Sequence, residues 1–408
     1  MSEPELEPTL SIDTALIHHA YRPPAGFASP QPGVFKASTV IFENVAAMRA
    51  RNWKEKVGYT YGLHGTPTTF TLDARIATLE GGLHSVLVPS GLAAIALTDM
   101  TFLKTGDEVL IPIDAYFPGA EFARRELAGW GIAHRMYDPA DANALAAMLT
   151  PATKLVWVEA PGSVTMAFPD VANLVRAARS TGALVAIDNT WGAGIAFDPF
   201  RIEAARDDEA PLGVDISVHA LTKYPSGGGD VLMGSVTTRD PALHLALNGA
   251  HMRMGWGVGA NDAEAVLRGL PSMRLRYTAA DAASRTLARW WAARPEVAQV
   301  LHPAMPGSPG HEHWRRLCKQ AAGLFSVVFD ARYSARQVDA FVDALRLYKI
   351  GFSWAGPVSL VVPYDLKAMR GDAQWRGTLV RFSIGLESVD DLIADQAQAL
   401  GRAFGAPA

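Results

Sequence analysis

The sequence is poor in the features that mark secreted, membrane-spanning and nucleic-acid-binding proteins. Its 408 residues include one cysteine, Cys318, so no disulfide can form within the chain, and a reducing compartment is expected. No uninterrupted apolar run reaches the length of a transmembrane helix, and the acidic start lacks the basic and apolar regions of a secretory signal. A formal net charge of −4 gives no basic footprint for nucleic acid. We therefore expect a cytoplasmic protein with no nucleic-acid or membrane partner.

The composition is that of a globular protein, with 49% hydrophobic and 19% charged residues. The length allows two or more domains. Residues 1–65 are rich in proline, glycine and aromatic residues and have few periodic runs, which predicts an extended arm that packs against another surface. Residues 66–260 predict a large domain, and residues 261–408 predict a smaller α+β domain.

Short apolar runs alternate with helical spacing in the large domain. The predicted strands are residues 85–89, 108–112, 154–159, 184–188, 215–219 and 232–236, with predicted helices at 142–149 and 171–179. This alternation predicts a mainly parallel, doubly wound α/β sheet. Beyond it, a long helix is predicted over 262–293, followed by strands at 324–329 and 378–383.

Polar and aromatic residues follow several of these strands. In open α/β sheets, ligands bind at the carboxyl ends of the strands, where Tyr116, Glu159, Asp188 and Lys223 are expected. A lysine and an acid on neighbouring strand ends suit pyridoxal phosphate (PLP). The lysine can bind the aldehyde, and the acid can hold the pyridine nitrogen protonated. Taken alone, either residue is more commonly the solvated edge of a loop.

A second signal follows the strand at 85–89. Gly91 and Leu92 open a predicted helix, and the free N–H groups and positive dipole at such an end suit a phosphate. An ordinary N-cap by Ser90 would explain the same residues.

Eight short segments, taken together in their order and spacing, are more specific than any one of them. They are YGLHGTPT at 61–68, LEGG at 79–82, PSG at 89–91, AY at 115–116, VEAPGS at 158–163, IDNT at 187–190, LTKY at 221–224 and RFSIGLE at 381–387. Through them the chain resembles the PLP-dependent enzymes of cysteine and methionine metabolism, the trans-sulfuration enzymes, over residues 12–405. The resemblance implies the aspartate-aminotransferase-like fold (fold type I), PLP as cofactor, and a small sulfur-containing amino acid as substrate.

Within the family, the chain is most similar to the cystathionine β-lyases. Trp191 stands where the γ-type enzymes usually carry phenylalanine, and residues 161–165 and the pair Ser353-Trp354 resemble β-lyase segments. The resemblance therefore implies β-elimination of L-cystathionine to homocysteine, pyruvate and ammonia. Alternatives are a cysteine desulfhydrase, a γ-lyase, cystathionine γ-synthase or, from another class, a PLP-binding regulatory protein.

The resemblance also implies residue roles. Lys223 resembles the lysine that binds the cofactor and acts as the base, and Asp188 the partner of the pyridine nitrogen. The cofactor-binding set also includes Tyr116, stacked on the ring, and Gly91, Leu92 and Thr222 around the phosphate. Tyr61 resembles a tyrosine that reaches the phosphate of a neighbouring subunit, which implies a homotetramer with shared active sites. Arg381 and Ser353, with Trp354 beside them, resemble the substrate-binding region, where arginine suits a carboxylate.

Some positions depart from the family pattern. Leu63 stands where an arginine usually contacts the phosphate, and His64 or Arg253 are candidates to replace its charge. Ala220 stands where many members carry serine, and residues 228–229 and 355–359 also differ. His311 and His313 do not form a convincing zinc motif because residues two apart do not share a helix face, so no metal is expected.

Overall fold

The computed structural model describes residues 11–19, 25–27, 29–54, 56, 58–204, 211–365 and 377–405. Its larger sheet has seven strands in the order β1-β7-β6-β5-β4-β2-β3. These are β1 (His84–Val88), β7 (Gly234–Thr238), β6 (Ile216–His219), β5 (Leu184–Asp188), β4 (Thr153–Glu159), β2 (Glu108–Pro112) and β3 (Ala133–Tyr137). All neighbouring pairs are parallel except those of β7, which runs antiparallel to both β1 and β6. The predicted mainly parallel α/β sheet is thus confirmed.

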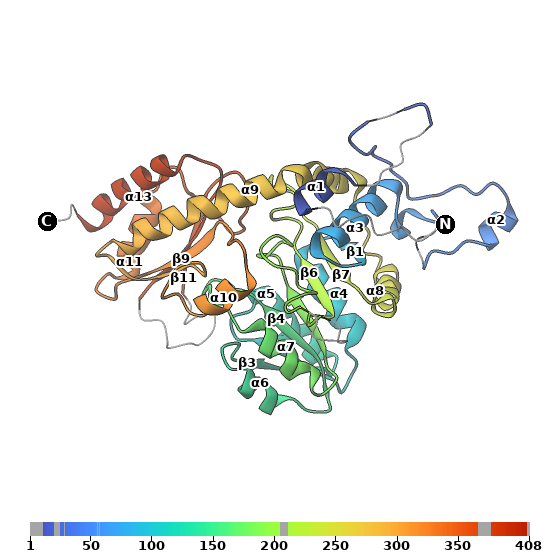
Figure 1. Cartoon of the computed structure of the whole chain (residues 1–408), viewed down its shortest axis with the longest axis horizontal. Helices are drawn as coiled ribbons and strands as arrows, with labels where there is room; N and C mark the ends of the chain where they lie inside the picture. Colours follow the sequence, from blue (N-terminus) through green and yellow to red (C-terminus); the bar gives the residue numbers. More distant parts are fainter. Residues whose placement is uncertain are drawn as a thin grey trace.

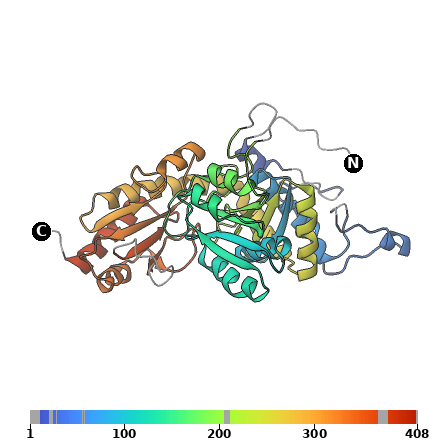
Figure 2. The ribbon, with the colours of Figure 1, turned by 90° about the horizontal axis from the view of Figure 1, so that it is seen from below.

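Helices cover both faces of this sheet (Figures 1 and 2). One buried cluster joins α1 (Ile12–Ile17), α3 (Pro67–Glu80), α6 (Ala142–Met148), α7 (Val171–Arg179) and the first half of α9 (Ala260–Ala292) to side chains such as Val156 and Ile187. The other joins α4 (Gly91–Phe102), η2 (Ala123–Leu127) and α8 (Pro241–Met254) to Val86 and Val218. Side chains alternate between the faces along each strand, so both faces become core.

The helices begin and end where local chemistry favours it. Thr66 caps α3 by accepting a hydrogen bond from the Thr69 N–H, and Pro67 occupies the first turn, where its missing donor costs nothing. The same helix ends at Gly81, whose φ of 75° suits glycine. Ser90 caps α4 through the Ala93 N–H. These caps place the α3 carboxyl end and the α4 amino end beside the sheet.

A smaller sheet forms the second part of the chain, with strand order β10-β11-β12-β9-β8. Its strands are β8 (Val297–Leu301), β9 (Leu324–Phe329), β10 (Lys349–Ile350), β11 (Leu360–Tyr364) and β12 (Leu379–Ser383). It packs with α11 (Ala335–Ala344) and α13 (Val389–Phe404) around Trp291, Phe341 and Phe382. This agrees with the predicted C-terminal α+β domain.

The helix α9 (Ala260–Ala292) joins the two parts. Its 33 residues correspond to about 50 Å, and in Figure 1 it runs from the larger sheet to the smaller one. Its first half contributes Leu267 and Met273 to the core of the larger part, and its second half contributes Leu287 and Trp291 to that of the smaller part. A single rigid element therefore relates the two sheets.

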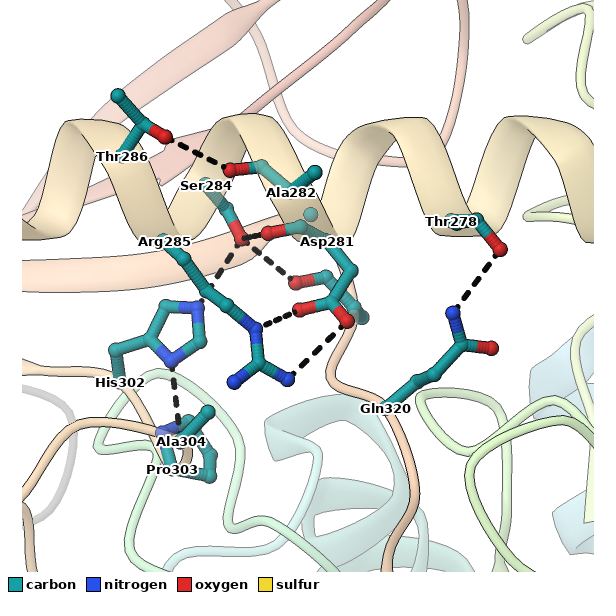
Figure 3. A network of polar contacts seen from close by, with 12 residues as sticks. Thr278, Asp281, Ala282, Ser284, Arg285, Thr286, His302, Pro303, Ala304 and Gln320 are labelled. Atoms are coloured by element: carbon teal, nitrogen blue, oxygen red, sulfur yellow. Dashed lines mark hydrogen bonds and ion pairs between the residues drawn. The ribbon is translucent and has the colours of Figure 1, made fainter.

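A buried polar network holds α9 to the loops beside it (Figure 3). The Ser284 hydroxyl lies 3.1 Å from both His302 Nε2 and the Ala322 carbonyl oxygen, and His302 Nδ1 accepts a 3.1 Å hydrogen bond from the Ala304 N–H. Because Nδ1 accepts, Nε2 carries the proton in neutral His302 and donates to Ser284. Burial lowers the pKa of His302 to about 3, so the ring is neutral. This serine–histidine pair therefore ties segments together and is not an activated nucleophile.

Several elements differ from the prediction. The strand predicted at 232–236 begins two residues later, and β3, β8, β10 and β11 were missed. β3 escaped because it is a polar edge strand in which Tyr137 alone is buried. Cys318 caps the end of α10 (His311–Leu317) in extended conformation and does not lie within the helix. It is buried, which raises its thiol pKa well above the usual value.

The described residues between 25 and 65 form most of an arm that extends from the larger part (Figure 1), including α2 (Val45–Arg49) and η1 (Gly62–His64). Ile41 on this arm is 91% exposed. We propose the division into an arm (1–65), a large domain (66–260) and a small domain (261–408), although residues 1–10 lie outside the described ranges. In the described ranges, no helix is both long and apolar enough to span a bilayer, and no group of three or more potential ligands suits a metal ion.

Candidate active site

A cleft of about 510 Å³ opens at the carboxyl ends of the larger sheet and is closed on one side by the smaller domain. Every predicted site residue lines it except Tyr61. The lining residues among those predicted are Gly91, Leu92, Tyr116, Asp188, Thr222, Lys223, Ser353, Trp354 and Arg381. These residues come from six segments that are distant in the sequence, and they meet in one cavity, as expected for ligand sites of α/β sheets.

Asp188 lies at the end of β5, beneath the cleft. Its Oδ1 accepts a 3.0 Å hydrogen bond from the Thr190 N–H. Burial raises the carboxyl pKa, while Thr190 and the nearby positive charges of His219 and Lys223 act in the opposite direction. A buried carboxyl with so few partners within the fold is suited to a protonated nitrogen of a ligand.

Lys223 approaches from the loop after β6. Its Nζ donates a 2.6 Å hydrogen bond to Ser353 Oγ and lies 5.4 Å from the centre of the Trp354 ring. Burial, followed by the charge of Arg381, lowers its pKa to about 8, although Asp188 opposes the shift. The amine is therefore available in neutral form near physiological pH, as a nucleophile or base requires.

The Lys223 contact depends on an unusual backbone. Ser353 has a φ of 95° and Ala355 a φ of 67°, backbone angles that residues other than glycine rarely adopt. This conformation is maintained next to Trp354, which packs against Tyr224 with ring centres 5.8 Å apart. The strained segment carries Ser353 from the small domain to the lysine of the large domain.

Arg381 on β12 brings a second cation into the cleft. It is 7% exposed, its Nη2 donates a 3.3 Å hydrogen bond to the Ser353 carbonyl oxygen, and its guanidinium lies 5.3 Å from the Tyr364 ring centre. No ion pair links it to a carboxylate of the described residues, and its Nε lacks a partner there. Burial lowers its pKa, which is the signature of a desolvated cation. A ligand carboxylate would satisfy it.

Tyr116 forms the opposite wall at the start of α5 (Phe117–Phe122). Its backbone N–H donates a 2.6 Å hydrogen bond to Glu159 Oε2, which fixes the loop. Burial, then the charges of Asp188 and Glu159, raise the pKa of its phenol, so the hydroxyl keeps its proton. The half-exposed ring is free to pack on a planar ligand.

The amino end of α4 lines the same cleft. The first N–H groups of a helix have no partner within it, so those of Gly91 and Leu92 can donate to an anion. A side chain at Gly91 would place its Cβ 2.6 Å from Ala220 Cβ, so glycine is required here by close packing. The Thr222 hydroxyl exchanges hydrogen bonds with the Met233 backbone, accepting at 3.1 Å and donating at 3.2 Å.

Tyr61 lies on the arm, outside the cleft of its own chain, and is 47% exposed. Leu63 and His64 border a different, small cavity beside Gly257. Burial and the charge of Arg51 lower the pKa of His64, so this residue is a poor replacement for the expected cation. Arg253, the other candidate, is exposed on α8 and does not line the cleft.

Sequence reasoning missed several residues of the cleft. Thr190 accepts a 2.9 Å hydrogen bond from the Ala220 N–H and so links the segments after β5 and β6. Tyr364, Phe352 and Met166 supply much of the apolar wall. Thr190 could have been found from its place within the IDNT segment, whereas β11 carries no signal that marks Tyr364.

The residues present fit PLP. Lys223 offers an amine for the aldehyde, Asp188 a buried acid for the pyridine nitrogen, and Tyr116 an aromatic face. The α4 amino end, which packs too closely on Ala220 for any side chain at Gly91, offers N–H groups for the phosphate. Arg381 remains available for a substrate carboxylate.

Comparison with known proteins agrees with this geometry. Residues 13–401 match the sequence profile of the Cys/Met metabolism PLP-dependent enzymes. A cystathionine β-lyase of Bordetella avium is 37% identical over 401 residues, covering 96% of this chain and 98% of its own. A cystathionine β-lyase of Escherichia coli K12 is 35% identical over 392 residues, covering 94% of this chain and 96% of its own.

A solved structure of a related enzyme has the same fold. The cystathionine γ-synthase of Xanthomonas oryzae pv. oryzae, in complex with aminoacrylate and cysteine, superimposes with a TM-score of 0.87 at 27% identity. The match covers 97% of this chain and 99% of that structure. The fold is therefore fold type I, and the chain belongs to the PLP-dependent enzymes of cysteine and methionine metabolism.

Proposed function

We propose that this enzyme is a carbon–sulfur lyase that performs β-elimination on L-cystathionine, yielding homocysteine, pyruvate and ammonia. The observation that carries the proposal is the meeting of Lys223 and Arg381 at Ser353. The lysine contacts the Ser353 hydroxyl at 2.6 Å and the arginine contacts its carbonyl oxygen at 3.3 Å. A base thus lies beside a carboxylate-binding cation, as removal of the α-proton of an amino acid requires.

The proposed roles follow from this arrangement. Arg381 binds the α-carboxylate, which leaves the α-carbon near Lys223. The Lys223 amine, with its pKa lowered to about 8, takes the α-proton. PLP, when bound, supplies the electron sink for this step. Asp188 holds the proton on the pyridine nitrogen, and the Tyr116 phenol keeps its own proton while it packs on the ring.

The Cβ–S bond then breaks and the thiolate leaves. Addition of one water to the remaining three-carbon fragment gives pyruvate and ammonia, which balances the reaction. The outer cleft that would receive the sulfur substituent is apolar, with Phe117, Met166, Leu232 and Phe352 on its walls. Such a surface suits a thioether. The similarity to cystathionine β-lyases supports this choice of substrate.

We also propose that the active enzyme is a homotetramer with shared active sites. The arm exposes large apolar side chains to solvent in the single chain, including Ile41, Val45 and Tyr61. Exposed apolar groups in such a cluster favour a protein partner. A neighbouring subunit is the partner that would bring Tyr61 to a cofactor phosphate.

The deciding experiment is incubation of the PLP-loaded enzyme with cystathionine, cysteine and methionine separately, with measurement of keto acids and free thiols. We expect pyruvate and homocysteine from cystathionine, and no turnover in Lys223→Ala. Release of 2-oxobutyrate would instead identify γ-elimination, which a γ-lyase performs. Absence of a keto acid from every substrate would favour a synthase or a regulatory PLP-binding protein.

A further inference from the structure

A fully buried polar cluster lies behind the active site, where α3 meets the larger sheet. Glu80, the last residue of α3, accepts hydrogen bonds from three side chains. They are His219 Nδ1 at 2.8 Å, Ser217 Oγ at 2.8 Å and Asn189 Nδ2 at 2.9 Å. Glu80 is 1% exposed and the three partners are completely buried.

The three partners lie on the two strand ends that carry the proposed catalytic groups. Asn189 directly follows Asp188 at the end of β5, and His219 ends β6, four residues before Lys223. The two strands are paired in parallel, with Asp188 opposite Val218. Asn189, Ser217 and His219 alternate with these residues, so they lie on the α3 side of the sheet.

Burying a carboxylate has a large desolvation cost unless donors compensate it, and apolar residues of similar size often serve a core better. Simple cohesion of the core therefore does not require Glu80. Hydrogen bonds are directional, whereas apolar packing is not. The hydrogen bonds of Glu80 can therefore fix the ends of β5 and β6 relative to each other.

Some of the titratable groups near Glu80 also act electrostatically on Asp188. His219 Nδ1 faces the carboxylate and so carries a proton, while Nε2 has no partner within the described residues. The electrostatic effect of His219 lowers the pKa of Asp188, against the larger effect of burial. Asp198 is a second nearby acid, and its pKa is raised by burial and also by Glu80. Lys223 faces Asp188 from the cleft side.

We propose that Glu80 is a positioning residue for the cofactor site. Through Asn189 and His219 it holds the ends of β5 and β6, and thereby sets where Asp188 and Lys223 stand relative to each other. The inference rests on the proposed roles of Asp188 and Lys223 toward PLP, and it goes beyond them in assigning a function to a group outside the cleft.

Glu108 provides a matched control. It begins β2, at the amino end of the sheet and away from the cleft, and it is 7% exposed. Its carboxylate also accepts three side-chain hydrogen bonds, from Arg135 Nε and Nη2 at 2.7 Å each and from Thr153 Oγ1 at 2.6 Å. A variant at Glu108 therefore removes a comparable set of contacts from the same sheet without affecting the strand ends at the site.

The test compares Glu80→Leu and Glu108→Leu as PLP-loaded enzymes, with melting temperature, PLP release and the pH titration of the visible absorbance as readouts. Both variants should melt at lower temperature than the wild type. We expect Glu80→Leu alone to release PLP about tenfold faster or more, and to shift the titration midpoint by about half a pH unit or more. Equal release rates and midpoints in the two variants would overturn the proposal.

A second pair of variants applies if Glu80→Leu does not fold. His219→Asn retains a side-chain N–H that can reach Glu80, whereas His219→Leu does not. We expect the asparagine variant to release PLP more slowly than the leucine variant, and equal rates would contradict the proposal. Wild-type absorbance that persists unchanged in Lys223→Ala would instead overturn the proposed cofactor role of Lys223, so the two failures are distinguishable.

Discussion

At the scale of single residues, the cleft combines two desolvated cations with a buried acid. Burial and then the charge of Arg381 lower the pKa of Lys223, whereas burial lowers the pKa of Arg381, which remains charged as arginines do in proteins. Ser353 contacts both of them. The lysine is thus prepared for nucleophilic chemistry and the arginine for binding an anion.

The pKa of Lys223 makes cofactor uptake pH-dependent. A neutral amine is needed to bind the aldehyde, so uptake of PLP by the apoenzyme should quicken as pH rises and level off above about 8. Stopped-flow absorbance between pH 6 and 9 measures this. Lys223→Ala should bind PLP without a link that borohydride can trap, and a flat pH profile in the wild type would contradict the assignment.

Arg381→Leu should weaken substrate binding without changing the cofactor. Loss of a hydrogen bond to a charged group costs about 1.5–3 kcal/mol, so kcat/KM should fall by roughly ten- to over a hundred-fold. The visible spectrum should stay intact, and Arg381→Lys should recover part of the loss. Steady-state kinetics with each amino acid decide this, and an unchanged KM throughout would show that Arg381 does not bind the carboxylate.

At the scale of secondary-structure elements, buried hydrogen bonds fix the position of one helix on the larger sheet and of another helix against neighbouring loops. α4 is tied to β4 by Asp99, whose Oδ1 accepts a 2.8 Å hydrogen bond from Trp157 Nε1. α9 is tied to the loops around His302 and Ala322 by Ser284. Both contacts are buried, so each has a measurable effect on stability.

Asp99 should make the protein less stable as pH rises. Burial raises its pKa from 3.8 to about 7, against the effect of the Trp157 bond, so the folded state binds its proton more tightly than the unfolded state. The contribution of protonated Asp99 to the free energy of unfolding is fully present below about pH 4, and it is lost as the pH rises to about 7. Asp99→Asn should therefore gain about 2–3 kcal/mol relative to wild type between pH 5 and pH 8.

Denaturant unfolding at those two pH values measures the effect of Asp99. Glu108→Gln serves as the control, because Arg135 lowers the pKa of Glu108 and its contribution should be constant over this range. A constant difference between Asp99→Asn and wild type at both pH values would refute the raised pKa.

Ser284→Ala should destabilise the junction of α9 with the small domain. The change leaves His302 Nε2 without its acceptor in a buried site, which costs about 1–3 kcal/mol. Thr286→Ala, two residues further along the same helix, removes a hydroxyl that bonds to the Ala282 carbonyl at an exposed position and should cost less than about 0.5 kcal/mol. Thermal unfolding of both variants tests this, and equal melting temperatures would contradict it.

At the scale of the whole molecule, the cleft lies between two parts that share α9, and the arm projects away from both (Figure 2). A single chain supplies Lys223, Asp188 and Arg381 to the cleft, yet leaves Tyr61 outside it. Among the described residues, the cations that line the cleft are Lys223 and Arg381, and both have other proposed roles. In the proposed homotetramer, an adjacent subunit would supply the remaining contacts.

Shared sites predict complementation. Tyr61→Phe and Lys223→Ala should each be impaired as homo-oligomers, because the first lacks a hydroxyl given to a neighbour and the second lacks the base. Co-assembled mixtures should recover part of the activity, since some sites then receive both intact residues. Sedimentation and activity of mixed and unmixed samples measure this, and a fully active monomer would exclude it.

Much of the larger sheet and many of the site residues could be predicted from the sequence, because they depend on short-range patterns. Apolar runs such as residues 184–188 and 324–329 coincide with β5 and β9, since strands buried on both faces are rich in apolar residues. The edge strand β3 was missed because a solvent-facing strand has no such requirement. The meeting of Asp188 and Lys223 was predicted from their places at the ends of neighbouring strands, whereas the presence of Arg381 beside them was predicted only through the resemblance to a family.

The sequence by itself determined which strands and helices form and which residues can carry the chemistry, because propensity, capping and hydrophobic periodicity act over a few residues. Only the tertiary structure decided which partners those residues contact and in which direction their pKa values shift. Ser353 meets Lys223 across 130 positions of the chain, and Glu80 meets His219 across 139. The lowered pKa of Lys223 comes from burial and from Arg381, which are consequences of packing distant segments together.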